Sequence, residues 1–415
     1  MSTTLMVAII VVLLLLIIVQ ISRIADASAR VRGEEQSRMD GNNWSARLFP
    51  IFGFVFLASV VGSAVYYAPF LLGSGRLPAA SIHGAELDSI FNITLLFTGV
   101  VFFATQIALF WFAYKYREQP GRRALFISHD NRLELVWTVI PAIVMALLVV
   151  GGLEAWNTTM ADVPEEAVPG EDYIEIEATG YQFAWDLRYP GADNVLGRKN
   201  FKLITGTNSL GQDFTDAKNI DDFTPDRIVL PVGKTVRVRI TAKDVLHNFY
   251  LPHFRVKMDA IPGLPTYFVF TPTQTTEDYR QNLRQYAEWQ EPADPNDPEG
   301  AEMWEVFNFE LACAELCGRG HWNMRRIVEI VTEEEYKEWL VSQEELSPYL
   351  MNVRGKPNDP HADVPVGGLK LEQRIAARKM SEKGVEDNVP EDAMVPREDT
   401  DADLDPIEGE MEMGM

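Results

Sequence analysis

The only two cysteines of the chain, Cys313 and Cys317, lie in the segment CAELCGRGHWNM together with His321 and Met324. These residues are four, four and three positions apart, so one compact turn can direct all four side chains to one point. A disulfide that closes so short a loop contributes little stability. Structural zinc sites use cysteine, histidine and carboxylates, whereas thiolate, imidazole and a weak thioether form the ligand set of copper electron-transfer sites. The segment therefore predicts a copper centre.

A second thiolate and a second imidazole decide how many copper ions such a centre holds. One copper ion needs a single thiolate, but two thiolates can bridge two ions, which then share one electron with little change in geometry. Of the six histidines, His247 and His253 follow a predicted strand, in the segment DVLHNFYLPHFRVKMDAIPG. Spacing favours His247 as the further ligand, although a lone histidine is more often a structural residue than a ligand.

The segments around these residues alternate apolar and polar side chains between turn signals, which is typical of β-strands. They are residues 173–191, 226–242, 266–272, 303–312 and 325–331. Several short strands of this kind indicate a β-sandwich or barrel. The segment TEEEYKEWLVSQ, which begins at Thr332, starts with a capping-box pattern and predicts a helix that closes the domain. Two polar stretches, 194–224 and 273–302, are expected to be insertions between strands.

Four charge-free apolar runs precede this domain, and each approaches or exceeds the roughly 20 residues that a membrane-spanning helix needs. They are residues 5–21, 48–72, 93–114 and 135–153. A secretory signal is the alternative for the first run, but that run lacks a basic segment before it and a clear cleavage site. Arginines concentrate after the first and third runs. By the positive-inside rule these two loops are cytoplasmic, and everything after Trp156 lies outside.

The net charge of the chain is −23, and the acidic excess lies after residue 156. Such a surface repels nucleic acid and attracts basic proteins, although acidity can also serve solubility alone. The last residues, 346–415, are acidic and poor in apolar side chains, so we expect a largely disordered tail. Its ending, MEMGM, offers thioethers for Cu(I), but a solvated tail is the simpler interpretation.

The motifs DVLHNF, KMDAIPG and CAELCGRGHWNM together resemble subunit II of cytochrome c oxidase, in the haem–copper superfamily. LELVWTVIPAIV, at 133–144, resembles the start of the second helix of that family. The resemblance covers about residues 93–341 and implies a helical membrane anchor, here of four helices, followed by a cupredoxin-like Greek-key barrel. The expected domains are an extra helix pair at 1–72, a transmembrane hairpin at 73–156, a copper domain at 157–345 and the tail at 346–415.

By position, the resemblance implies a dinuclear copper centre, called CuA, on six residues. They are His247, Cys313, Glu315 through its backbone carbonyl, Cys317, His321 and Met324. It also implies that the Glu315 side chain reaches a magnesium or manganese ion shared with subunit I. Without the resemblance, Glu315 is interpreted as an exposed acidic residue in a loop.

Three further positions match functional residues of the family. Glu134 matches a glutamate at the mouth of a proton pathway into subunit I, although a helix-end carboxylate at the membrane interface fits this position equally well. Phe183 stands where the family has a tryptophan thought to pass electrons from the donor, and Trp185 keeps the second aromatic position. Unlike tryptophan, phenylalanine cannot donate a hydrogen bond, and its ring is harder to oxidise. Electrons from the donor therefore reach the copper centre through another residue, or the ring of Phe183 serves only as a contact surface.

The resemblance implies an electron-accepting subunit of a terminal respiratory oxidase. It would take electrons from cytochrome c into CuA and pass them to haem in subunit I, where oxygen is reduced and protons are pumped. The chain has no Cys-x-x-Cys-His motif for a haem of its own, so the donor is a separate cytochrome c, either soluble and basic or tethered to the membrane. We expect a multi-pass protein of a bacterial inner membrane, with its copper domain on the periplasmic side.

Departures from the family pattern suggest a larger respiratory assembly. They are Leu264 in place of a common arginine, the 273–302 insertion and the extra helices.

Three other functions are alternatives to that of an oxidase subunit. A quinol oxidase subunit II has lost the copper ligands, nitrous oxide reductase lacks the helix hairpin, and a membrane-anchored copper carrier or assembly protein would need an exchangeable copper site. The last is the main alternative.

Overall fold

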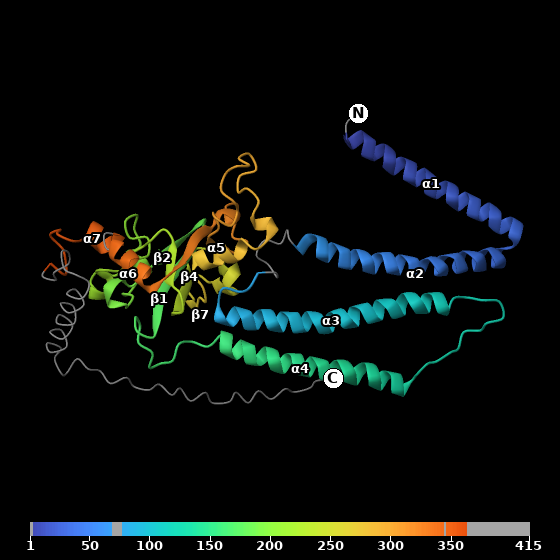
Figure 1. Cartoon of the computed structure of the whole chain (residues 1–415), viewed down its shortest axis with the longest axis horizontal. Coiled ribbons are helices and arrows are strands. Elements are labelled where there is room, and N and C mark those ends of the chain that lie inside the picture. The colour runs from blue at the N-terminus through green and yellow to red at the C-terminus, as the bar shows by residue number, and fades with distance from the viewer. Residues whose placement is uncertain (1–2, 69–76, 344–345, 363–415) are drawn as a thin grey trace, which may run out of the picture. The chain divides into compact units, whose positions relative to one another are not determined.

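The computed structural model describes residues 3–68, 77–343 and 346–362 (Figure 1). The chain begins with four helices and continues into a β-domain. The helices are α1 (Thr3–Arg32), α2 (Glu34–Tyr67), α3 (Ile82–Lys115) and α4 (Asn131–Thr159). Residues 363–415, which make up most of the predicted tail, lie outside the described residues.

Three of these helices, α2, α3 and α4, are long and apolar enough to cross a membrane. Almost none of their apolar side chains is buried within the chain, which is the surface that a helix in lipid requires. In α1, the apolar stretch among the side chains that are described is Leu15–Ile24. A fourth spanning helix therefore stays a prediction.

The ends of two helices carry the capping interactions that satisfy free backbone groups. The Ser81 hydroxyl accepts a hydrogen bond from the Gly84 backbone at the start of α3, and the Asp130 carboxylate accepts from Arg132 and Leu133 at the start of α4. Serine and aspartate are preferred at this position because their oxygens pair with unsatisfied N–H groups.

The β-domain consists of two sheets whose strands alternate in sequence between them. One sheet has the order β2-β1-β4-β7 and the other β3-β9-β8-β5-β6. Strands β1 and β4, and likewise β3 and β9, are parallel, and the remaining pairs are antiparallel. The strands are β1 (Tyr173–Tyr181), β2 (Ala184–Arg188), β3 (Ile228–Pro231), β4 (Thr235–Ala242), β5 (His247–Leu251), β6 (Val256–Ala260), β7 (Thr266–Phe270), β8 (Phe309–Cys313) and β9 (Arg325–Val331).

Burial follows the period of two that the sequence predicts. Along β4, Val236, Val238 and Ile240 are buried and the residues between them are half-buried. The facing sheet contributes Phe249 and Phe309, which are fully buried. The core of the domain therefore lies between the two sheets, and its apolar contacts fix the register of the strands.

Some segments differ from their predicted structure. Residues 303–308 form turns, so the strand expected over 303–312 begins only at Phe309. Strands β5 and β6 were not predicted. The residues of β5 do not alternate regularly, and those of β6 alternate over only one short stretch. The 273–302 stretch contains a helix, α5 (Thr276–Leu283), with its own capping box. The predicted closing helix is present as α6 (Glu333–Ser342), and Thr332 and Glu335 exchange the expected capping bonds.

The start of α3 is bonded to the loop after β5. The Ala80 N–H donates to the His253 carbonyl at 2.8 Å, and the Ser81 hydroxyl donates to the Phe254 carbonyl at 2.6 Å. Arg255 donates to both carboxylate oxygens of Asp88, at 2.8 and 2.9 Å. These contacts attach the transmembrane hairpin to the β-domain.

A second compact unit is formed by residues 190–223 and 341 onward. Within it, the amide of buried Asn219 donates to the Arg198 and Asp213 carbonyls. The Ser347 hydroxyl, at the start of α7 (Pro348–Asn352), donates to the Ile220 carbonyl at 2.7 Å. Residues 346–362, assigned to the tail from composition, thus fold together with the 194–224 insertion.

Candidate metal centre

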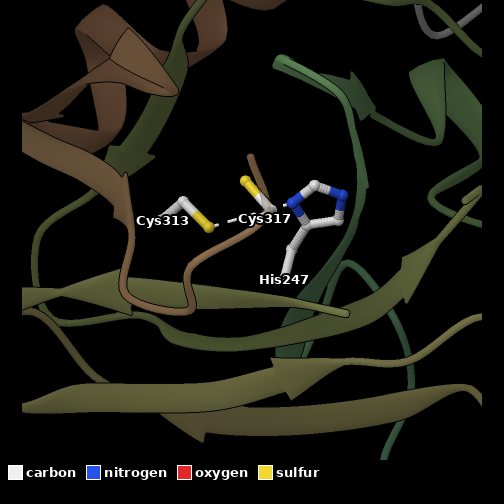
Figure 2. A group of neighbouring side chains, drawn as sticks. All are labelled: His247, Cys313 and Cys317. Atoms are coloured by element: carbon white, nitrogen blue, oxygen red, sulfur yellow. Dashed lines mark hydrogen bonds between the residues drawn. The ribbon is translucent and has the colours of Figure 1, made fainter. Parts of the chain in front are cut away.

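Two neighbouring strands and the loop after them bring the predicted ligands together. His247 is the first residue of β5, and Cys313 is the last residue of β8, whose partner across the ladder is Phe249. Cys317 and His321 follow in the loop, and Met324 directly precedes β9. Figure 2 shows His247, Cys313 and Cys317 gathered at one point, and one ligand atom from each lies within 4.8 Å of the others.

The donor atoms fall into two groups, one around each cysteine sulfur. Cys313 Sγ lies 3.8 Å from His247 Nδ1 and 3.2 Å from the Glu315 carbonyl oxygen. Cys317 Sγ lies 3.6 Å from His321 Nδ1 and 3.3 Å from Met324 Sδ. Each sulfur therefore has one imidazole and one weaker donor beside it, and both thiols are free.

Burial and a carboxylate fix the position of the His247 ring. The side chain is fully buried, and its Nε2 lies 2.9 Å from the Asp244 carboxylate. A carboxylate acceptor on one ring nitrogen selects the tautomer that leaves the other free for a metal. The Nδ1 atom that faces Cys313 is then free to bind a metal ion.

The cysteine pair lies in a partly desolvated environment. Burial, reinforced by the neighbouring Cys313, raises the pKa of Cys317 to about 11. Without a cation the thiol form therefore dominates at neutral pH, and a bound metal has to displace its proton. The donor set of two thiols, two imidazoles, a thioether and a carbonyl is soft, and it fits copper better than magnesium or calcium.

The two aromatic candidates occupy different places around the centre. Trp185 is 1% exposed, and its ring centroid lies 6.1 Å from that of His247, so it cannot touch a donor protein. Phe183 is 39% exposed and covers the ligand loop, because a Cβ at Gly320 would lie 2.4 Å from its ring. The glycine at 320 allows this close approach.

One aromatic residue of the ligand loop was not singled out by its type or spacing. Trp322, between two ligand positions, is 77% exposed, and Leu316 in the same loop is 80% exposed. Alternation does not apply in a loop, so their orientation could not be predicted. Large apolar side chains that project from a metal-binding loop form a contact surface.

The side chains of the remaining candidates take no part in this cluster. His253 lies in an aromatic pocket formed by Tyr279, Phe307 and Phe309, which agrees with its reading as a structural residue. The side chain of Glu315 is exposed. Glu134 lies in the first turn of α4, 3.8 Å from His129 Nδ1, and both carboxylates face solvent.

Comparison with known proteins follows the same division of the chain. The family description "Cytochrome C oxidase subunit II, transmembrane domain" matches residues 73–154, and "Cytochrome C oxidase subunit II, periplasmic domain" matches 174–282. The alternative cytochrome c oxidase subunit 2 of Bradyrhizobium diazoefficiens is 31% identical over 259 residues, which are 62% of this chain and 80% of that protein.

The chain belongs to the cytochrome c oxidase subunit II family. Cytochrome c oxidase subunit 2 of Cereibacter sphaeroides is 24% identical, over 65% of this chain and 79% of that protein. A crystal structure is also similar, that of the periplasmic domain of cytochrome oxidase subunit II of Bradyrhizobium japonicum, whose sequence is 24% identical. The match covers 43% of this chain and 99% of that domain, with a TM-score of 0.27. The family has a membrane anchor and a periplasmic domain, and it implies copper. The periplasmic match ends at residue 282, before the cysteine loop.

Proposed function

We propose that this chain is the electron-accepting subunit of a terminal respiratory oxidase, with a dinuclear CuA centre. The observation that carries the proposal is the donor arrangement around Cys313 and Cys317, in which each sulfur has one imidazole and one weaker donor within 3.8 Å. Family membership supports the same role.

The residues of the site would hold two copper ions in a fixed arrangement. The side chains of Cys313, Cys317, His247, His321 and Met324 would hold the ions, together with the backbone carbonyl of Glu315. When bound there, a thiolate-bridged copper pair supplies a redox centre that takes up and releases one electron at a time. Asp244 orients the His247 ring, and the buried strand ends limit any change of geometry between the two redox states.

The surface around the ligand loop suits a transient contact with a donor. Phe183, Leu316 and Trp322 are exposed there, and an exposed apolar patch beside a redox centre favours docking that brings the two centres close. A cytochrome c domain, soluble and basic or membrane-tethered, is the proposed donor, because the acidic chain attracts positive charge over long range. Trp185 would act inside the domain, against His247.

The electron acceptor would be haem in subunit I of the same complex. Glu315, whose side chain points to solvent, would reach the magnesium or manganese ion at the contact with subunit I. Glu134 would stand at the mouth of a proton pathway on the other side of the membrane. The complex would reduce oxygen and pump protons in a bacterial inner membrane, and the extra helices would contact further subunits.

Electron paramagnetic resonance of the full-length chain, loaded with copper in detergent, tests this function. We expect the hyperfine pattern of one unpaired electron shared equally by two copper ions, with two coppers bound per chain. Cys317→Ser should convert it to a single-copper pattern, because only one bridging thiolate remains.

A single-copper spectrum in the unaltered chain would contradict the proposal and favour a copper carrier. So would copper that exchanges rapidly with a chelator. Val341→Ser, an exposed substitution on α6 away from the ligands, serves as the matched control and should leave the spectrum unchanged.

A further inference from the structure

A polar cavity of about 330 Å³ lies between the start of α2 and the loop after α3. Arg47 and Arg117 line it, with Asp40 as the acidic residue. Arg117 is held by neutral acceptors, since it donates to Asn43 Oδ1 at 3.1 Å and to the Tyr114 carbonyl at 2.9 Å. Arg47 is exposed, and it has no acidic partner among the residues that the structure describes. The cavity therefore carries a net positive charge with guanidinium groups available to a ligand.

The cavity lies at the level where the membrane meets water. The apolar run of α2 begins at Leu48 and that of α3 ends at Tyr114, so both arginines stand just outside the hydrocarbon region. Trp44, which lines the cavity, is of a type enriched at this interface. The nearby acid Glu118 is already paired with Arg38 at 3.0 Å, so it does not cancel the charge of the cavity.

An apolar groove of about 700 Å³ continues from this point along the same two helices. On α2, residues 50, 53, 57 and 61 follow residue 47 at intervals of three or four, so they lie on the same face of the helix. The ring of Phe110 fills the space beside Gly53, where a Cβ would lie 2.5 Å away. The groove is lined by Pro50, Leu57 and Val61 from α2 and by Phe103, Ile107 and Phe110 from α3.

We propose that the cavity and the groove together bind one anionic phospholipid of the inner leaflet. Its phosphate would be held by Arg47 and Arg117, because guanidinium groups pair with phosphate through two parallel hydrogen bonds. Its acyl chains would lie in the groove. Basic pockets between transmembrane helices on the cytoplasmic side are suited to anionic headgroups. A helix of a partner subunit would fill the groove but leave the charge of the cavity unmatched.

Native mass spectrometry of the full-length chain in detergent tests the site, with phosphatidylglycerol and phosphatidylethanolamine of the same acyl chains as probes. One net positive charge near the surface is worth about a fivefold preference for the anionic lipid. Arg47→Gln should abolish this preference, and Arg47→Lys should keep most of it. Ala58→Phe, which projects into the groove, should weaken binding of both lipids and leave the preference unchanged.

Arg123→Gln is the matched control, because Arg123 lies with Arg117 in the basic loop after α3 but does not line the cavity. It should leave both affinities unchanged. The proposal is overturned if neither lipid stays bound, if the two lipids bind equally well, or if Arg123→Gln costs as much preference as Arg47→Gln. None of these outcomes depends on copper, so the test stands apart from that of the proposed function. Circular dichroism checks that each variant retains its helices.

Discussion

At the scale of single residues, the ligand set could be predicted but its surroundings could not. The spacing of Cys313, Cys317, His321 and Met324 predicts one compact site, and the structure brings these side chains together with His247. From the sequence, both His247 and His253 are candidates for the second imidazole ligand, because both follow a predicted strand. Their difference is one of packing, because the ring of His253 is enclosed by aromatic side chains. Such packing depends on strands far apart in the sequence.

The exposed ring of Trp322 leads to a prediction about electron uptake. We expect Trp322→Ala to slow reduction of the copper-loaded chain by reduced cytochrome c about tenfold, since an aromatic residue at the centre of a contact often contributes 1–2 kcal/mol, at about 1.4 kcal/mol per tenfold. Stopped-flow absorbance measures this rate. Trp322→Phe should restore most of it, and the paramagnetic resonance spectrum should stay the same in both variants. An unchanged rate in Trp322→Ala would exclude a role for this ring in docking.

His253 leads to a prediction about acid stability. Burial lowers the pKa of His253 to about 4, while an unfolded histidine has a pKa near 6.5. Between these values the unfolded chain binds a proton that the folded chain does not, so stability falls as the pH drops from about 6.5 to about 4. We expect His253→Phe to remove about 2 kcal/mol of the loss between pH 7 and pH 4.5.

Urea denaturation of the full-length chain at the two pH values, followed by tryptophan fluorescence, measures this difference. His129→Phe is the control, because that ring is exposed in the loop between α3 and α4 and should change neither curve. Equal acid sensitivity in His253→Phe and in the unaltered chain would contradict the assignment.

At the scale of elements, the alternation of apolar and polar residues predicted most of the strands and missed β5 and β6. β4 shows the regular pattern, with every second residue buried. β5 is buried at four of its five positions, so its sequence carries no period of two. The polar composition of 273–302 gave no sign of α5, because a helix of eight residues leaves only a capping box as its signal.

The contact between the membrane hairpin and the β-domain also belongs to this scale. Arg255 adopts a left-handed backbone conformation, with φ of 56°, and its guanidinium reaches Asp88 and the Leu77 carbonyl. Removing Asp88 would leave a partly buried guanidinium with one acceptor group fewer. Loss of a charged hydrogen-bond partner costs roughly 1–3 kcal/mol.

We therefore expect Asp88→Ala to speed amide hydrogen exchange in residues 80–88 and 252–256, with no effect on the copper spectrum. Hydrogen exchange with mass spectrometry measures this local opening. Glu86→Ala, an exposed substitution two residues earlier in α3, should leave exchange unchanged. If both variants exchange alike, the contact does not hold the hairpin to the domain.

At the scale of the whole molecule, hydropathy and charge predicted the division into membrane helices and a β-domain. Three helices meet the length and hydropathy that a membrane requires, and the basic loops fall at the end of the hairpin opposite the β-domain. Composition could not predict that residues 346–362 pack with the 194–224 insertion, because the unit depends on single contacts, such as the hydrogen bond of Ser347 to the Ile220 carbonyl and the ring contact of Phe214 with Tyr349. Neither segment contains a run of apolar residues that would predict such a contact.

The position of β9 between β3 and β8 sets the order in which this protein can be assembled. β9 pairs in parallel with β3, so Ile228 meets Val328 a hundred residues later. Pairings this distant in sequence form late and slowly. As the chain is exported, β8 and its cysteine therefore lack one neighbour until β9 has crossed the membrane. A chain that ends at Met324 should contain every ligand and yet give no two-copper spectrum, whereas one that ends at Gln343 should give it in full. The copper ions proposed for this site could then bind only after β9 has joined the sheet.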